Sequence, residues 1–233
     1  MQVARLALLG LALITLVVAC WLTGCGGSQE TPAAGTEASS KSAATPGDPA
    51  KPAIVLPQPA AKPADPVVVL HTTAGDIKVR LFQQKAPQTV SNFLHNYVAR
   101  GFYEETIVHH VEPGVMLIAG GYGSDLAAKE TRTPIYNESR GGLSNRRGTV
   151  AMIHDGSSPH SGTSQFFINL ADNPDFDAQS TDAGDEFGYC VFGEVIEGME
   201  VVDRIAQSQT TATGEFASVP SPPVVVSSAV QLR

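Results

Sequence analysis

The chain has 233 residues and a formal net charge of −8, and its lysines and arginines form no continuous basic run. Because nucleic-acid phosphates are bound by clustered cations, this balance argues against a nucleic-acid partner. Two of the three cysteines, Cys20 and Cys25, lie near the N-terminus, so Cys190 has no partner for an internal disulfide in the rest of the chain. Cys190 lies in an apolar run, which predicts a small buried side chain rather than a reactive nucleophile.

The first 25 residues have the pattern of a signal peptide. An apolar run at residues 6–18 follows a short, positively charged start and is short for a membrane span. The next motif, Leu22-Thr23-Gly24-Cys25, resembles the lipobox of bacterial lipoproteins, which implies that Cys25 receives lipid and becomes the new N-terminus. Cys20 is a weaker second match because Trp21 would follow it. An uncleaved membrane anchor and an ordinary secretory signal are the alternatives.

Residues 26–65 are rich in Ala, Pro, Gly, Ser, Thr and Lys. Such a segment cannot bury enough apolar surface to offset the entropy of ordering it, so we predict a disordered tether. The leader and the tether together predict an extracytoplasmic protein that is lipid-anchored to a bacterial membrane. The remaining residues, 66–233, are a suitable length for one folded domain.

The folded region begins with a predicted hairpin and a helix. Residues 67–72 are typical of a strand, residues 74–76 of a turn, and residues 77–81 alternate apolar and polar side chains like a half-buried strand. Apolar residues at helical spacing follow, with Pro87 in the predicted first turn and Gly101 at the predicted end.

Short apolar runs separated by Gly, Pro, Asn and Asp occupy residues 102–195, a pattern typical of antiparallel sheets. A second helical pattern runs through Met199, Val202 and Ile205. We expect residues 210–223 to form a loop and residues 224–232 to form the last strand. The fold class predicted from these elements is mainly β, a closed antiparallel barrel with a helix over each end.

Four stretches in register resemble the cyclophilin family. They are Gly101-Phe102-Tyr103 through Gly120-Gly121, Asn137-Glu138 through Met152, Ser161 through Asn169, and Phe187 through Val195. The resemblance spans residues 66–233. It implies an eight-stranded barrel capped by two α-helices, with the activity of a peptidyl-prolyl cis-trans isomerase that assists protein folding. It also implies X-Pro-containing polypeptides as partners. Nothing in the sequence indicates a cofactor, and we expect a monomer.

An isomerase of this kind must bind the twisted X-Pro bond more tightly than either planar form, because amide resonance creates a barrier of about 18–20 kcal/mol. An apolar pocket grips the proline ring and excludes water, and a donor aimed at the amide stabilises the charge redistribution of the twisted state. The resemblance assigns Gln165 to the peptide backbone. Alternation along a strand predicts that Phe166 and Phe167 face opposite ways, and we assign Phe167 to the pocket and Phe166 to the core. The apolar wall carried over from the family comprises Met116, Phe167, Phe176 and Tyr189.

Several positions depart from the family pattern. His110 stands where the family has its catalytic arginine, Val115 replaces a phenylalanine, and Ala119 takes the place of a glutamine. The residues that contact the peptide backbone after Met152 become Ile153 and His154. Because a neutral histidine donates one N–H whereas arginine offers five, we predict weakened catalysis. If His110 supplies the donor as an imidazolium, the activity should rise as the pH falls below about 6.5. The alternative is a proline-peptide-binding module or chaperone without useful catalysis.

Four histidines, His109, His110, His154 and His160, raise the alternative of a metal site. Neighbouring residues of a regular strand point to opposite faces, which argues against His109 and His110 sharing one ion. Since no metal-ligand spacing such as HExxH or CxxC is present, we expect no metal.

Overall fold

The computed structural model describes residues 64–181 and 184–232. The predicted signal peptide, the lipidation site at Cys25, and all but the last two residues of the predicted tether lie outside the described residues. Within the described part of the chain, no helix combines the length and the apolar character that a membrane span needs.

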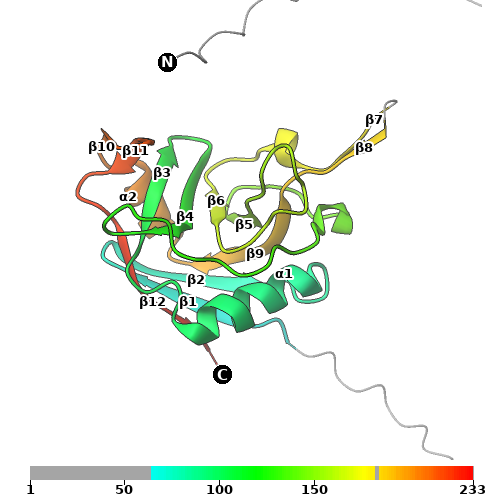
Figure 1. Ribbon diagram of the computed structural model, residues 1–233, viewed down its shortest axis with the longest axis horizontal. Helices are drawn as coiled ribbons and strands as arrows, with labels where there is room; N and C mark the ends of the chain where they lie inside the picture. Colours follow the sequence, from blue (N-terminus) through cyan, green and yellow to red (C-terminus); the bar gives the residue numbers. More distant parts are fainter. Residues whose placement is uncertain (1–63, 182–183, 233) are drawn as a thin grey trace, which may run out of the picture. The chain divides into compact units, whose positions relative to one another are not determined.

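Eight antiparallel strands close into a barrel, as predicted (Figure 1). Strands that neighbour each other in the barrel are often distant in the sequence, and the first strand pairs with the last. In barrel order the strands are β1 (Val67–Thr72), β12 (Val225–Gln231), β3 (Thr106–Glu112), β4 (Met116–Gly123), β6 (Phe166–Asn169), β5 (Thr149–Met152), β9 (Cys190–Glu197) and β2 (Gly75–Leu81).

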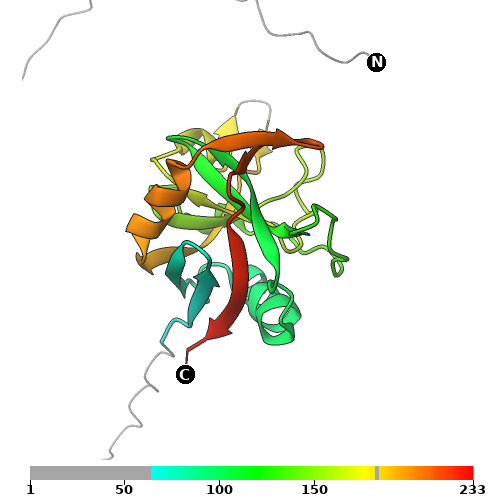
Figure 2. The same ribbon diagram turned by 90° about the vertical axis from the view of Figure 1, so that its left-hand side faces the viewer.

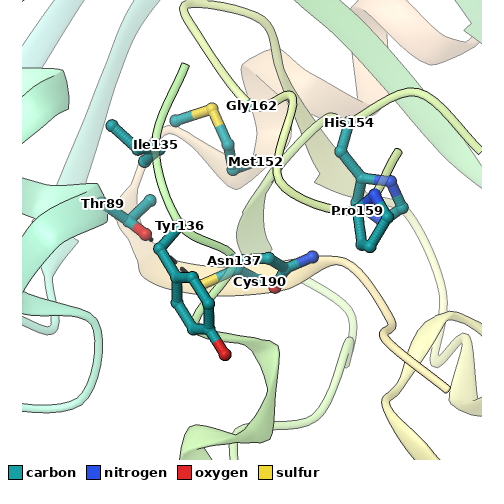
Figure 3. Close-up of a pocket in the computed structure, with 9 residues that line it drawn as sticks. All are labelled: Thr89, Ile135, Tyr136, Asn137, Met152, His154, Pro159, Gly162 and Cys190. Atoms are coloured by element: carbon teal, nitrogen blue, oxygen red, sulfur yellow. Dashed lines mark hydrogen bonds between the residues drawn. The ribbon is translucent and has the colours of Figure 1, made fainter. Parts of the chain in front are cut away.

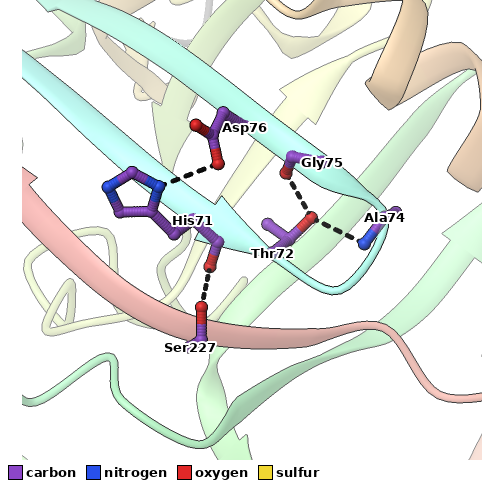
Figure 4. A network of polar contacts seen from close by, with 6 residues as sticks. All are labelled: His71, Thr72, Ala74, Gly75, Asp76 and Ser227. Atoms are coloured by element: carbon purple, nitrogen blue, oxygen red, sulfur yellow. Dashed lines mark hydrogen bonds and ion pairs between the residues drawn. The ribbon is translucent and has the colours of Figure 1, made fainter.

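The predicted β1–β2 hairpin is confirmed, and polar contacts fix its turn (Figure 4). The Thr72 hydroxyl donates to the carbonyl of Gly75 at 2.6 Å and accepts the Ala74 N–H at 3.1 Å. Gly75 has φ +131°, and a Cβ there would lie 2.9 Å from a methyl carbon of Val201. The turn therefore requires glycine both for its backbone conformation and for its approach to the helix that carries Val201.

Both predicted helices are present and lie on different sides of the barrel (Figure 2). The first runs from α1 (Pro87–Ser91) through the π-helical η1 (Asn92–Tyr97) and the 3-10 turn η2 (Val98–Arg100), and it ends at Gly101 with φ +64°. The second is α2 (Met199–Ala206). Each helix buries its apolar face against the barrel interior, which explains the helical spacing of apolar residues in the sequence.

Alternation along the strands divides the side chains between the barrel interior and an outer cluster. Phe166 packs in the interior, whereas Phe167 lies in the outer cluster, as predicted. The outer cluster has a buried centre of Ala151, Phe167 and Val191. The half-buried side chains packed against it are Phe82, Met116, Ile118, Leu143, Ile153, Phe176 and Tyr189.

The expectation of a loop at residues 210–223 was wrong. This segment contains a hairpin of β10 (Thr210–Thr213) and β11 (Phe216–Pro220), turning at Gly214 with φ +60°. The β10 residues are exposed, so no burial pattern marked the strand in the sequence. The remaining elements are the hairpin β7 (Gln179–Thr181) and β8 (Gly184–Glu186), and the 3-10 turns η3 (Ser139–Gly141) and η4 (Pro174–Phe176).

Candidate active site

One row of paired residues crosses five strands of the barrel. His110 on β3 pairs with Ile118 on β4, Ile118 pairs with Phe167 on β6, Phe167 pairs with Ala151 on β5, and Ala151 pairs with Val191 on β9. Because directly paired residues point to the same side of a sheet, His110 lies on the outer face with this row. The row joins the candidate catalytic residue to the centre of the outer cluster.

Three aromatic rings form one end of the outer cluster. The ring centroids of Phe167 and Phe176 are 5.7 Å apart, those of Phe167 and Tyr189 are 5.3 Å apart, and those of Phe176 and Tyr189 are 5.6 Å apart. All three pairs meet edge to face, which is the favoured geometry for aromatic rings. Met116 packs against the same cluster. The four side chains predicted for the apolar wall therefore come together, and their contact with a substrate stays a prediction.

The buried Asn145 positions two of these rings through their backbones. Its side-chain amide donates to the carbonyls of Phe176 at 3.1 Å and Tyr189 at 3.3 Å, and to the Asp177 carboxylate at 2.9 Å. The Tyr189 N–H also donates to the Phe176 carbonyl at 2.8 Å. Sequence reasoning missed this role of Asn145, since an isolated asparagine carries no signal of distant partners.

A bulge in β3 changes the faces of the strand on which the two adjacent histidines are expected to lie. Val108 pairs with Ala119 and His110 pairs with Ile118, so His109 is an extra residue in the strand. Val108 and Val111 pack in the interior, whereas His109 packs against Tyr122 and Phe216, outside the interior cluster. Strict alternation between the two histidines was therefore the wrong argument against a shared ion.

A search of the described residues finds no group of three or more His, Cys, Asp or Glu side chains that could hold a metal ion. His109 is 5% exposed, and its Nδ1 has no hydrogen-bond partner. Burial lowers the pKa of His109 from 6.5 to about 4, with a smaller lowering by the nearby His110. Hydrogen bonds that the imidazole donates to the Ile107 backbone and the Gln165 side chain oppose this shift only weakly. His109 is therefore a neutral packing residue at pH 7. The expectation of no metal stays a prediction.

Gln165 lies beside His109 and β4. A hydrogen bond with the Gln165 side chain acts on the pKa of His109, and a Cβ added to Gly121 would lie 2.6 Å from the Gln165 side chain. The Gln165 carbonyl accepts the N–H of Ile153 at 3.0 Å. Its backbone thus ties β6 to the segment after β5, and its predicted hydrogen bond to a peptide stays a prediction.

Ala119 does not line the outer face. Its side chain packs in the barrel interior, and Ile118 faces outward opposite His110. The sequence comparison that aligned Ala119 with the family's glutamine was therefore off by one residue along β4, since a shift of one reverses the face of a strand residue. The position beside His110 is apolar.

Val115 is half-buried in the β3–β4 turn, where its carbonyl accepts the N–H of Leu170 at 2.8 Å and the side chain of Asn173 at 3.0 Å. It is not among the described side chains that pack against the outer cluster. Its predicted effect on the proline pocket stays a prediction.

His154 stacks on Tyr189, with ring centroids 4.6 Å apart and an interplanar angle of 25°. Its Nδ1 lies 2.8 Å from the Asp155 carbonyl, and its Nε2 lies 3.2 Å from the Gly188 carbonyl. Ile153 packs directly against the outer cluster. The two residues predicted to contact the peptide therefore differ in position, with Ile153 in the cluster and His154 behind Tyr189.

Two cavities adjoin His154. A small one of about 10 Å³, with room for about one water molecule, reaches Thr89, Met152 and Cys190 (Figure 3). Burial raises the pKa of the Cys190 thiol to about 11, in line with the predicted inert cysteine. A larger hollow of about 210 Å³ is lined by His154, Gly156, Asp175, Phe176, Asp177, Gln179, Glu186, Phe187, Gly188 and Tyr189.

Comparison with known proteins agrees with this geometry. Residues 67–231 match the family model described as "Cyclophilin type peptidyl-prolyl cis-trans isomerase/CLD". Peptidyl-prolyl cis-trans isomerase A of Dickeya dadantii is 49% identical over 162 residues, which cover 70% of this chain and 82% of the relative. Peptidyl-prolyl cis-trans isomerase B of Escherichia coli is 46% identical over 162 residues, covering 70% of this chain and 97% of the relative.

A solved structure shows the same fold. The crystal structure of a cyclophilin-type peptidyl-prolyl cis-trans isomerase from Cryptosporidium parvum has a TM-score of 0.55 and 25% sequence identity, and the match covers 72% of this chain and 98% of that one. The closed barrel, the aromatic cluster and the similar proteins all indicate the same family. This chain belongs to the family of cyclophilin-type peptidyl-prolyl cis-trans isomerases.

Proposed function

We propose that this isomerase acts on X-Pro bonds of extracytoplasmic polypeptides and that His110 limits its rate. The observation that carries the proposal is the row from His110 through Ile118 to Phe167. With strands about 4.8 Å apart, the His110 backbone lies about 10 Å from that of Phe167. A proline ring bound on the aromatic wall would place its amide between His110 and Phe167. The amide would then lie on the side from which a donor on β3 approaches.

The low isomerisation rate that we expect follows from the chemistry of the donor. Arginine is always charged and its long side chain carries five N–H groups in a rigid fork, whereas a neutral imidazole carries one. Ile118 beside His110 adds no donor. Stabilisation of the twisted amide is therefore expected to depend on the proton state of one short side chain.

Exchange of His110 tests the proposal. We expect His110→Arg to raise kcat/KM by about tenfold or more, because it restores a permanent charged donor. We also expect the wild-type rate to rise toward acid pH and the variant to lose that rise. The measurement is the isomerisation rate of an X-Pro peptide between pH 5.5 and 8. His95→Arg, on an exposed position of η1, is the matched control and should change neither quantity.

Equal rates and equal pH profiles for wild type and His110→Arg would contradict the role of His110. A wild-type rate at background with recovery in His110→Arg would instead favour the proline-peptide-binding module. The 45–49% identity to proteins named as isomerases favours the enzyme.

The extracytoplasmic part of the proposal is supported by the sequence of the leader. An apolar run followed by Leu22-Thr23-Gly24-Cys25 is the pattern expected of a protein that is exported and then lipid-modified. A lipid on Cys25 would hold the isomerase at a membrane, and residues 26–65 would extend between the lipid and the barrel.

A further inference from the structure

We propose that His154 is a positioning residue that holds Tyr189 in the aromatic wall through ring stacking and a hydrogen bond from its imidazole to a backbone carbonyl. This role rests on the isomerase activity of the domain. It differs from the direct peptide contact that the family resemblance implies, because His154 acts through Tyr189.

The first observation is the stack. The His154 and Tyr189 rings lie 4.6 Å apart and only 25° from parallel. Tyr189 also contacts Phe167 and Phe176, in both cases edge to face. A flat ring behind Tyr189 therefore sets the plane in which Tyr189 meets the wall.

The second observation is the pair of carbonyl partners. The Asp155 carbonyl lies 2.8 Å from Nδ1, and the Gly188 carbonyl lies 3.2 Å from Nε2. Carbonyl oxygens only accept hydrogen bonds, so a neutral imidazole satisfies one of them and a doubly protonated ring satisfies both. Gly188 immediately precedes Tyr189, so a bond from Nε2–H acts on the backbone that carries the tyrosine.

The third observation is that Gly188 cannot adjust independently. A Cβ there would lie 2.3 Å from the Phe176 carbonyl oxygen and 2.3 Å from the Asp177 carbonyl carbon. The Gly188 carbonyl also accepts the Asn137 side-chain amide at 2.9 Å. The chain before Tyr189 is thus packed directly against the segment that carries Phe176, and a shift at Gly188 would move both rings.

The test compares His154→Ala, His154→Phe and His154→Arg in the full chain. The wall binds planar and twisted prolines alike, so its loosening should raise KM with little change in kcat. We expect His154→Ala to raise KM about three- to tenfold. His154→Phe keeps a ring but no donor and should have an intermediate KM. His154→Arg can stack and donate to both carbonyls, so it should recover most of the affinity that the alanine variant loses.

The split between KM and kcat, together with recovery in His154→Arg, separates positioning from general stability. His95→Ala, an exposed histidine on η1, is the matched control and should leave KM unchanged. Loss of kcat at constant KM in His154→Ala would overturn the proposal, as would a wild-type KM in His154→Phe. A high KM in His154→Arg would also overturn it.

Failure of the proposed catalytic role is distinguishable from failure of this one. The role of His110 is read from kcat/KM and its pH profile in His110→Arg, in which His154 is intact. The role of His154 is read from KM in variants that keep His110.

Discussion

At the scale of single residues, His109 shows how burial sets the behaviour of a side chain. It packs against Tyr122 and Phe216, at centroid distances of 4.7 and 5.6 Å. Phe216 comes from the β10–β11 hairpin, so protonation of His109 would place a charge beneath that hairpin. The neighbouring His110 remains half-buried on the outer face, and the β3 bulge gives the two histidines these different surroundings.

We predict an acid-dependent loss of stability caused by His109. The folded-state pKa is about 4, below the ordinary value of 6.5, so below pH 6.5 the unfolded chain takes up a proton that the folded chain does not. The free energy of unfolding should therefore fall as the pH drops from 6.5 toward 4, by about 3 kcal/mol at most. Urea denaturation at pH 7 and pH 4.5 measures this fall in the free energy of unfolding. His109→Phe should reduce this loss, whereas the exposed control His95→Phe should not. An unchanged loss in His109→Phe would refute the assignment.

At the scale of elements, the first helix depends on a distant side chain for its N-terminus. The N-cap residue, Ala86, makes no side-chain hydrogen bond to the helix. Instead, the Glu138 carboxylate accepts the N–H groups of Gln88 at 3.1 Å and Thr89 at 2.8 Å, together with the Thr89 hydroxyl at 2.8 Å. Fifty residues separate Glu138 from Gln88, so this cap is a tertiary contact.

We predict that Glu138→Ala lowers the free energy of unfolding by about 1–2 kcal/mol, because it leaves helical N–H groups without their acceptor. Chemical denaturation of the full chain provides the measurement. The exposed Glu130 serves as a matched position, and Glu130→Ala should change the stability by less than about 0.5 kcal/mol. Equal stabilities for the two variants would show that water replaces the cap.

At the scale of the whole molecule, the closure of the barrel and the location expected from the predicted leader are separate questions. The pairing of β1 with β12 closes the barrel, and the Ser227 hydroxyl of β12 adds a hydrogen bond of 3.1 Å to the His71 carbonyl of β1 (Figure 4). A closed barrel leaves no unpaired edge among its eight strands. The leader is instead expected to determine where the barrel works.

We predict that Cys25→Ala moves the protein from the membrane fraction to the soluble extracytoplasmic fraction of a bacterial host. The reason is that one cysteine is expected to carry the lipid that anchors the chain. Incorporation of a labelled fatty acid, followed by fractionation, measures this. Cys20→Ala is the matched control and should keep the label. Labelling that survives in Cys25→Ala and disappears in Cys20→Ala would assign the lipid to Cys20.

The sequence by itself determined the barrel class, both helices and the opposite faces of Phe166 and Phe167. These features follow from local periodicity, which depends on neighbours two to four positions away. The exposed β10 strand was not predicted, since no burial alternation marks it.

Only the tertiary structure decided the details of the site. The β3 bulge places both histidines outside the interior cluster, Ile118 rather than Ala119 lies opposite His110, and His154 stacks behind Tyr189. Each of these features depends on strand register or on contacts between residues far apart in the chain. Register is chosen by the packing of the whole barrel, so no local pattern in the sequence carries it.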